Sequence, residues 1–387
     1  MRLNPVLAQL GAYSIATVQE RARDLRAAGV QVVDFSIGDP REPTPPFIAE
    51  ALKNAVPEVS QYPATAGIPE LRFAVSDYLD RRFGVTVDPT TEVIPTSGSK
   101  EAVFNTPLAF IDRDAGDVVV YGTPGYPIYD RGARLAGAAV HPVVLRDDFV
   151  LRVDDVPDEV WAKTKLVWIC SPHNPTGAVT PSDELAKLLE RCREVDALLL
   201  SDECYVDVYE PAIYPEGPPS TLQVAGDSYR NLLAFYSCSK RSGMTGYRSG
   251  AIVGDPEAIA ALKQLRTGTG TVSQEFVQTA AAAAWSDDTH AAERRAIFSE
   301  KRAVLRKAFE DLGYATVASQ AGLYLWIRVG DDLAATDALL EGGVVVSPGR
   351  FFGEGGEGYL RLALVPTVEE CELAVEVIHQ CLRRGTE

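Results

Sequence analysis

The feature that most constrains this chain is the alternation of short apolar runs with helix-like segments. Eight runs rich in β-branched and large apolar residues lie at Val32–Ile37, Val93–Thr96, Val118–Tyr121, Val140–Leu145, Leu166–Cys170, Ala197–Leu200, Leu232–Tyr236 and Ala251–Val253. Helix-like segments separate most of them, among them Lys100–Phe110, Ile128–Leu135, Ser182–Glu194 and Glu257–Arg266. Strands that alternate with helices predict a largely parallel sheet with helices on both faces. The predicted fold class is therefore α/β.

The sequence changes character after Arg266. A Thr/Gly stretch (Thr267–Thr271) leads into a long helical region, Gln274–Leu312, and then into short strands at Leu323–Val329, Val344–Ser347 and Tyr359–Val365. Near the N-terminus, Phe35–Pro40 is expected to be a strand that runs into a turn and joins an arm to the main body. We therefore expect residues 1–48 to form an arm and part of a small domain, residues 49–275 a large domain, and residues 276–387 a small C-terminal domain.

Charge and cysteine content exclude several classes of protein. The chain has 387 residues with 37 Lys and Arg against 54 Asp and Glu, a net charge of −17, and no basic run that would attract nucleic acid or a membrane surface. Six cysteines without a C-x-x-C pair predict neither a disulfide framework nor a zinc site. The four histidines lack metal-ligand spacing, and no Ser/His/Asp set stands out. Without a signal peptide or an apolar run of membrane length, a soluble cytoplasmic protein is expected.

Chemically rich residues follow four of the predicted strands. Ligands of a parallel sheet bind outside the carboxyl ends of its strands. The segments found there are Ser97–Lys100, Ser171–Gly177, Ser201–Tyr205 and Ser237–Lys240. These four segments predict one site at that edge of the sheet.

Lys240 is the candidate nucleophile. It follows the apolar run Leu232–Tyr236, and Arg248 lies eight positions later. Burial and a neighbouring cation both lower the pKa of a lysine, which an imine-forming nucleophile requires. A lone lysine is far more often a solvated surface charge, so the assignment depends on its neighbours.

Those neighbours resemble a known family. Ser237-x-Ser239-Lys240 with Gly246-x-Arg248-x-Gly250 resembles the pyridoxal-phosphate attachment site of class I/II aminotransferases. Further signatures follow in the same order and spacing, namely Asn174–Gly177, Asp202-x-x-Tyr205 and the stretch from Ser347 to Arg361. The resemblance runs from about Phe35 to the end. It implies fold-type I architecture, a large domain with a mostly parallel seven-stranded sheet between helices and a smaller α/β domain.

The resemblance also implies roles around the pyridine ring of the cofactor. Lys240 anchors pyridoxal phosphate and serves as general acid and base. Asp202 keeps the ring nitrogen protonated, so that the ring acts as an electron sink. Tyr205 and Asn174 hydrogen-bond the phenolic oxygen of the ring. On structural grounds alone, Asp202 would be a helix cap, Tyr205 a half-buried core tyrosine and Asn174 a turn former.

Phosphate, ring-stacking and substrate contacts are implied in the same way. The phosphate cradle comprises Gly98, Ser99, Lys100, Ser237, Ser239 and Arg248, with Tyr62 reaching over from the partner subunit of a homodimer. Tyr126 matches the aromatic residue that stacks on the ring, although packing alone would also explain it. Arg361 clamps the substrate α-carboxylate, with Gly38 contributing a backbone contact nearby. A solvent-exposed arginine on an edge strand is the alternative.

Within the family, several stretches are most similar to N-succinyldiaminopimelate aminotransferases. They are Phe35–Phe47, Tyr62–Gly67, Ser239–Met244 and Ala284–Arg294, and the Thr267–Thr271 loop departs from that pattern. The predicted reaction exchanges an amino group between glutamate and N-succinyl-2-amino-6-oxopimelate. The carboxylates of this substrate that lie far from the reacting carbon require further cations. The candidates are Arg41, Lys100 and Arg266. The alternatives are an aminotransferase for LL-diaminopimelate, aspartate, an aromatic amino acid or alanine, a pyridoxal-phosphate C–S lyase, and a non-enzymatic sensor domain.

Overall fold

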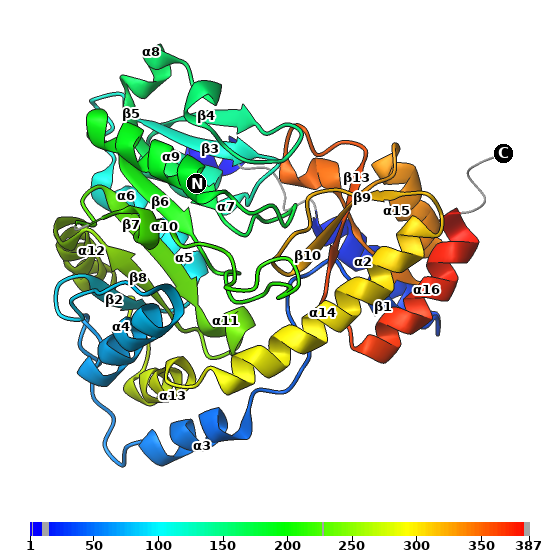
Figure 1. Cartoon of the computed structure of the whole chain (residues 1–387), viewed down its shortest axis with the longest axis horizontal. Helices are drawn as coiled ribbons and strands as arrows, with labels where there is room; N and C mark the ends of the chain where they lie inside the picture. The colour runs from blue at the N-terminus through cyan, green and yellow to red at the C-terminus, as the bar shows by residue number, and fades with distance from the viewer. Residues whose placement is uncertain (2, 10–14, 227, 383–387) are drawn as a thin grey trace.

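A seven-stranded sheet forms the centre of the larger of two bodies in the computed structural model, which describes residues 1, 3–9, 15–226 and 228–382 (Figure 1). The strand order is β2–β8–β7–β6–β5–β3–β4. The strands are β2 (Val93–Thr96), β3 (Val118–Thr123), β4 (Ala139–Val144), β5 (Thr164–Cys170), β6 (Leu198–Asp202), β7 (Leu232–Ser237) and β8 (Gly250–Gly254). Only β8 is antiparallel to its neighbours. The α/β class and the mostly parallel seven-stranded sheet are confirmed.

Both faces of this sheet are covered, which explains why its strands are continuous apolar runs. Every residue of β6, β7 and β8 is buried. Along β7, Leu232, Ala234 and Tyr236 pack into one apolar cluster, whereas Leu233 and Phe235 pack into another. Successive side chains of a strand point to opposite faces, so one run supplies two layers of core.

Helices flank the sheet in the larger body. They are α3 (Pro46–Ala55), α4 (Pro69–Phe83), α5 (Ser99–Asn105), α6 (Pro107–Phe110), α7 (Ile128–Ala136), η1 (Val153–Asp155), α8 (Asp158–Trp161), α9 (Ser182–Glu194), α10 (Thr221–Val224), α11 (Cys238–Arg241), α12 (Pro256–Thr269) and α13 (Glu275–Trp285). The single helix expected over Lys100–Phe110 is wrong: Pro107, which has no N–H, starts a second helix there. Conversely, α12 continues through Thr269 and ends at Gly270, whose φ is +66°.

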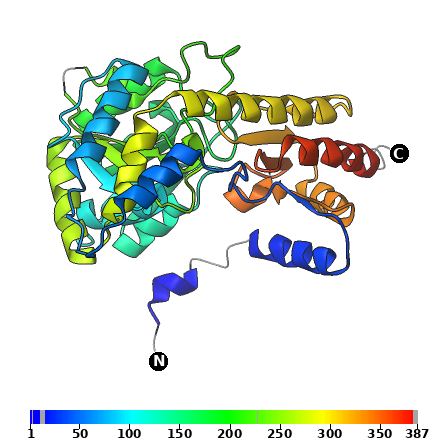
Figure 2. The same ribbon diagram turned by 90° about the horizontal axis from the view of Figure 1, so that it is seen from below.

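The smaller body combines the C-terminal part of the chain with the N-terminal arm. Its antiparallel sheet has the order β12–β13–β10–β9, and β1 pairs in parallel with β11. Its elements are α2 (Ile15–Ala27), β1 (Val33–Asp34), α14 (Thr289–Glu310), β9 (Ala315–Thr316), β10 (Tyr324–Arg328), α15 (Asp332–Glu341), β11 (Val344–Val345), β12 (Ser347–Pro348), η2 (Gly349–Phe352), β13 (Tyr359–Ala363) and α16 (Val368–Leu382), while α1 (Pro5–Gln9) stands apart (Figure 2). The strand expected from Val32 ends at Asp34, before the predicted turn.

The two bodies are joined at the corner between α13 and α14. A single helical region was expected from Gln274 to Leu312, but the helix is interrupted between Trp285 and Thr289. Helix α13 packs against α3 and α4, whereas α14 runs on to lie beside α16 in the smaller body (Figures 1 and 2). The domain boundaries at residues 48 and 275 stay predictions. Among the described residues, no helix is long and apolar enough to cross a membrane.

Candidate active site

A cavity of about 820 Å³ lies at the carboxyl ends of the large sheet's parallel strands, against the smaller body. Segments that follow β2, β3, β5, β6 and β7 line it, together with the N-terminal arm and β13. The predicted site residues in its lining are Gly38, Ser99, Lys100, Tyr126, Asn174, Tyr205, Ser237, Ser239, Lys240, Arg248 and Arg361. The structure thus brings together residues from widely separated parts of the sequence.

Lys240 lies in the short helix α11, which begins directly after β7. The Ser237 hydroxyl accepts a hydrogen bond from the Ser239 N–H and caps this turn. Lys240 Nζ donates to the carbonyl oxygen of Gly38. Desolvation lowers the pKa of Lys240 to about 8, with the nearby Arg248 and Arg361 acting in the same direction against the attraction of Asp39. A lowered pKa makes the neutral, nucleophilic amine available nearer to neutral pH.

Asp202 ends β6 and is buried, with 5% of its surface exposed. The Tyr129 hydroxyl donates to its Oδ2 at 2.8 Å, and the Cys204 N–H donates to its Oδ1 at 3.3 Å. Burial raises the pKa of Asp202, and these hydrogen bonds oppose the shift. Asp202 does not itself line the cavity, but the residues that follow it, Cys204 and Tyr205, do.

Arg361 is a buried cation whose hydrogen-bond partners are neutral. Its Nη1 donates to Asn174 Oδ1 at 3.1 Å and its Nη2 to the carbonyl oxygen of Ser36 at 2.6 Å. Its guanidinium carbon lies 4.5 Å from the Tyr324 ring centroid and 4.3 Å from that of Phe352. Its buried Nε has no hydrogen-bond partner, and no carboxylate of the described residues pairs with it. A buried guanidinium without an anion is costly, so this geometry favours a carboxylate ligand.

Hydroxyl and guanidinium donors line another part of the same cavity. Gly98 has a φ of +79°, and a Cβ built on it would lie 2.2 Å from Arg248 Nη2. Only glycine therefore allows the Arg248 guanidinium to approach this turn so closely. Ser99, Ser237 and Ser239 line the cavity alongside Arg248. Three hydroxyls around one guanidinium suit a phosphate group.

Aromatic residues border this site as well. Tyr126 lines the cavity after β3, with its ring centroid 5.6 Å from that of Tyr129. The Tyr205 hydroxyl lies 3.0 Å from that of Tyr324, which was not predicted from the sequence. Tyr324 begins the apolar strand β10, where it resembles an ordinary core residue.

Besides Gly98 and Asp202, three further predicted residues lie away from the cavity lining. Tyr62 is fully exposed, and its expected role involves a second copy of the chain, so that role stays a prediction. Arg41 pairs with Glu370 at 2.6 Å at the surface. Arg266 is 3% exposed and pairs with Glu101 at 2.8 Å. Neither arginine is placed to bind a remote carboxylate in the cavity, whereas Lys100 is.

Three charged residues of the cavity lining were missed, among them Asp130, which pairs with Arg134 at 2.8 Å. Arg131 lies in the first turns of α7, five positions after Tyr126, and Glu354 lies in the glycine-rich loop that follows η2. The only sequence signal for Arg131 was its short distance from Tyr126. Glu354 lies among glycines and another acid, a composition that is typical of an ordinary loop and gives no signal of a site.

The arrangement meets the needs of pyridoxal phosphate. The donors around Arg248 suit its phosphate, Asp202 suits its ring nitrogen, and Lys240 has the lowered pKa needed to bind its aldehyde. Among the described residues, no three His, Cys, Asp or Glu side chains are placed to hold a metal ion. Fold and site together define a fold-type I pyridoxal-phosphate enzyme.

Comparison with known proteins gives the family. The family model "Aminotransferase class I and II" matches residues 30–378. An LL-diaminopimelate aminotransferase of Nitratidesulfovibrio vulgaris is 36% identical over 96% of this chain and 97% of its own length. A 4-dedimethylamino-4-oxo-anhydrotetracycline transaminase of Streptomyces rimosus is 38% identical over 89% and 92%. A probable N-succinyldiaminopimelate aminotransferase structure from Thermus thermophilus has a TM-score of 0.87 at 29% identity, covering 95% and 99%. The chain belongs to the class I and II aminotransferases and depends on pyridoxal phosphate.

Proposed function

We propose that this enzyme transfers the amino group of N-succinyl-LL-diaminopimelate to 2-oxoglutarate. The observation that carries the proposal is that Lys100 and Arg131 line the same cavity as Arg361. One guanidinium suffices for the α-carboxylate of any amino acid. Additional cations suit a substrate with further carboxylates remote from the reacting carbon.

Each side chain of the site has a separate role in the proposed reaction. When bound, pyridoxal phosphate withdraws electrons from the substrate α-carbon. Arg361 holds the α-carboxylate, and Lys240 Nζ moves a proton between the α-carbon and the C4′ atom of the cofactor. Asp202, buried and hydrogen-bonded, holds the proton on the ring nitrogen. Glutamate and the second substrate use this one site in turn.

LL-diaminopimelate is the alternative substrate, and Glu354 is the residue that favours it. This carboxylate lines the cavity that also contains Arg131. The remote end of LL-diaminopimelate carries a free ammonium as well as a carboxylate, whereas in the succinylated compound that nitrogen is an amide. Similarity to the Nitratidesulfovibrio vulgaris enzyme supports the same alternative.

A half-reaction experiment separates these possibilities. The cofactor-loaded enzyme is mixed with N-succinyl-LL-diaminopimelate, LL-diaminopimelate, glutamate, aspartate, an aromatic amino acid or alanine, and the loss of the cofactor aldehyde is followed by absorbance. Conversion by the succinylated compound and glutamate alone supports the proposal. Conversion by LL-diaminopimelate instead selects the alternative, and conversion only by other amino acids overturns both. Keto acid released in many equivalents per active site without any amino acceptor would indicate a lyase.

Variants of the cavity lining sharpen this experiment. Arg131→Gln should lower kcat/KM for either diaminopimelate compound but not for alanine. Glu354→Gln should lower it for LL-diaminopimelate alone. Arg41→Gln is the matched control, because Arg41 pairs with Glu370 outside the cavity. An unchanged kcat/KM for every substrate in Arg131→Gln would contradict the assignment of Arg131.

We also propose a homodimer in which Tyr62 of each subunit contacts the cofactor phosphate of the other. Tyr62 is fully exposed in a single chain and would otherwise leave a large aromatic ring in water. Light scattering measures the assembly. A mixture of Tyr62→Ala with an inactive Lys240→Ala protein should recover partial activity, because one hybrid site then has both residues intact. No recovery from a confirmed mixed dimer would contradict this role.

A further inference from the structure

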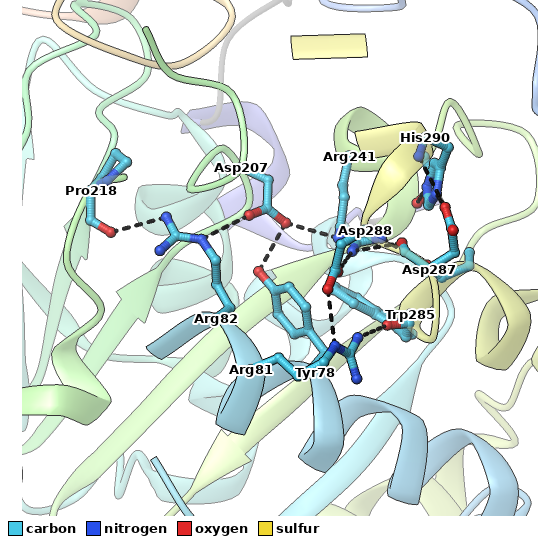
Figure 3. A network of polar contacts seen from close by, with 12 residues as sticks. Tyr78, Arg81, Arg82, Asp207, Pro218, Arg241, Trp285, Asp287, Asp288 and His290 are labelled. Atoms are coloured by element: carbon cyan, nitrogen blue, oxygen red, sulfur yellow. Dashed lines mark hydrogen bonds and ion pairs between the residues drawn. The ribbon is translucent and has the colours of Figure 1, made fainter. Parts of the chain in front are cut away.

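The residue directly after the catalytic lysine is itself buried and charged. The side chain of Arg241 is 3% exposed, and its Nε lies 2.9 Å from Asp207 Oδ2. Its Nη2 lies 2.6 Å from Asp288 Oδ1, and its Nη1 donates to the carbonyl oxygen of Ala284 at 2.7 Å (Figure 3). The guanidinium also packs near the rings of Tyr78 and Trp285, at 4.9 and 5.2 Å. Both Nη atoms are thus hydrogen-bonded to protein groups, whereas Nε lies close to the Asp207 carboxylate without forming a hydrogen bond.

The partners of Arg241 belong to three different parts of the molecule. Asp207 lies two residues after Tyr205, in the turns that follow β6. Asp288 precedes α14, the helix that enters the smaller body. Tyr78 and Arg82 of α4 contact the same Asp207 carboxylate, at 2.9 and 3.2 Å (Figure 3). Arg241 therefore lies where the lysine segment, the Tyr205 segment and the start of α14 meet.

A second chain of polar contacts attaches the lysine segment to the same corner. Ser242 Oγ lies 2.9 Å from His290 Nε2, and His290 Nδ1 lies 2.6 Å from Asp287 Oδ1. This is a Ser/His/Asp set that the sequence did not reveal. Ser242 is fully buried and lines none of the cavities described here, so no substrate reaches it. Its role is to hold the backbone beyond Lys240 against the first turn of α14.

The electrostatics of this cluster make its geometry well defined. Burial would raise the pKa of Asp207, but Arg241 and Arg82 lower it below its ordinary value. Burial and the Asp207 charge raise the pKa of Tyr78, which therefore remains a donor. Buried ion pairs contribute little net stability relative to apolar residues, but breaking one by removing a single partner is costly. A cluster of this kind is better explained by a requirement for geometry than by stability.

We propose that Arg241 is a positioning residue for transamination. By binding Asp207 and Asp288 at once, it fixes the backbone of Lys240 relative to Tyr205 and to the first turn of α14. Lys240 must reach the substrate α-carbon while Tyr205 holds the ring of the same cofactor. A displacement of about 1 Å between such groups lowers a reaction rate by as much as about 100-fold.

Arg82 offers a matched control, because it binds the same Asp207 carboxylate from α4 and has no contact with the lysine segment. Four quantities are compared in Arg241→Gln and Arg82→Gln: the melting temperature of the holoenzyme, kcat for the fastest amino donor, KM for the same donor, and the pH midpoint of the cofactor absorbance. The charged groups that face Lys240, namely Asp39, Arg248 and Arg361, stay in place in both variants. A midpoint that also moves in Arg241→Lys, which keeps the positive charge, therefore reports a moved Lys240.

The expected result is a lower melting temperature in both variants but a catalytic effect in only one. Arg241→Gln should lower kcat about 10- to 100-fold with KM nearly unchanged, and should shift the absorbance midpoint. Arg82→Gln should leave kcat and the midpoint as in the wild type. Equal effects of the two variants on kcat, or an unshifted midpoint in Arg241→Gln, would overturn the proposal.

Two further variants keep the test decisive if Arg241→Gln fails to fold. Arg241→Lys retains the charge but cannot reach both carboxylates, and Asp288→Asn removes one of them at a half-exposed position. Each of these two variants should lower kcat by a smaller factor than Arg241→Gln. Both should shift the pH midpoint of the cofactor absorbance in the same direction. A wild-type kcat and midpoint in both would show that Arg241 has a structural role only.

Discussion

Two buried arginines, Arg361 in the cavity wall and Arg241 behind the catalytic lysine, have opposite surroundings. Arg361 donates to an amide and a backbone carbonyl, both of them neutral, and it lines the cavity. Arg241 pairs with two carboxylates and with backbone carbonyls. Both are about equally buried, so exposure does not distinguish a binding residue from a structural one. The charge of the groups that contact each arginine does distinguish them.

This difference gives a general criterion for such sites. An arginine that the protein buries without an anion has donors and charge available for a ligand. An arginine whose carboxylates are already present orients the chain instead. The predictions below test that distinction, beginning with the largest effect.

Lys240→Ala should retain cofactor through the proposed phosphate contacts but lose turnover by about 1000-fold or more, because the proposed mechanism uses Lys240 as both nucleophile and proton carrier. Stopped-flow absorbance of the half-reaction measures the loss, and dialysis followed by phosphate analysis measures retention. Turnover near the wild-type level would remove Lys240 from the mechanism.

Arg361→Gln should raise KM for amino acid substrates by about 30-fold or more, since a buried carboxylate-binding charge is lost. Arg241→Gln, in contrast, should act on kcat. Steady-state kinetics on both variants, run side by side, measures kcat and KM separately. If both variants raised KM alone, the distinction drawn here between the two arginines would be wrong.

Attachment of pyridoxal phosphate to the apoenzyme should accelerate as the pH rises and level off above about 8, the pKa of Lys240. The sign follows because only the neutral amine attacks the aldehyde, and burial lowers the pKa from its ordinary 10.5. Arg361 helps to lower this pKa, so the midpoint should move to higher pH in Arg361→Gln. Attachment rates across the pH range give both midpoints, and an unmoved midpoint would show that the two side chains do not interact.

Arg41→Ala should have the smallest effect of the series. Arg41 forms an ion pair with Glu370, and its side chain is 42% exposed, so its loss should cost less than about 1 kcal/mol of unfolding free energy. Substrate preference should be unchanged. A selective loss of activity on diaminopimelate compounds would show that Arg41 approaches the substrate in a conformation other than this one.

Much of the large sheet could be predicted because its strands are buried on both faces. The runs at Val93–Thr96 and Leu232–Tyr236 match β2 and β7 to within one residue. Strand direction could not be predicted, because β8 is as apolar as the strands that run in the opposite direction on either side of it. Helix breaks at Pro107 and at the α13–α14 corner were missed, although a proline and the polar run Ser286–Thr289 are typical of helix boundaries.

The site residues next to strand ends could likewise be predicted, since chain order alone places them at one edge of the sheet. Contacts between distant segments could not. Arg266 had the charge expected of a ligand-binding residue, but its pairing with Glu101 spans 165 positions. The same holds for Arg241 and Asp207, whose contact depends on the packing of two separate turns. Sequence therefore identified the chemistry of the site better than the neighbours that orient it.

Because α14 is long, a small rotation at the corner near Asp288 would move the other end of the helix by a larger distance. Its 22 residues span about 33 Å, and its first turn is held by the polar cluster around Arg241. A tilt of about 5° there would carry the far end of the helix through about 3 Å, the length of a hydrogen bond. Because α14 packs against β9 and β10, a small displacement beside Lys240 would be larger where the helix contacts the sheet that contains Arg361.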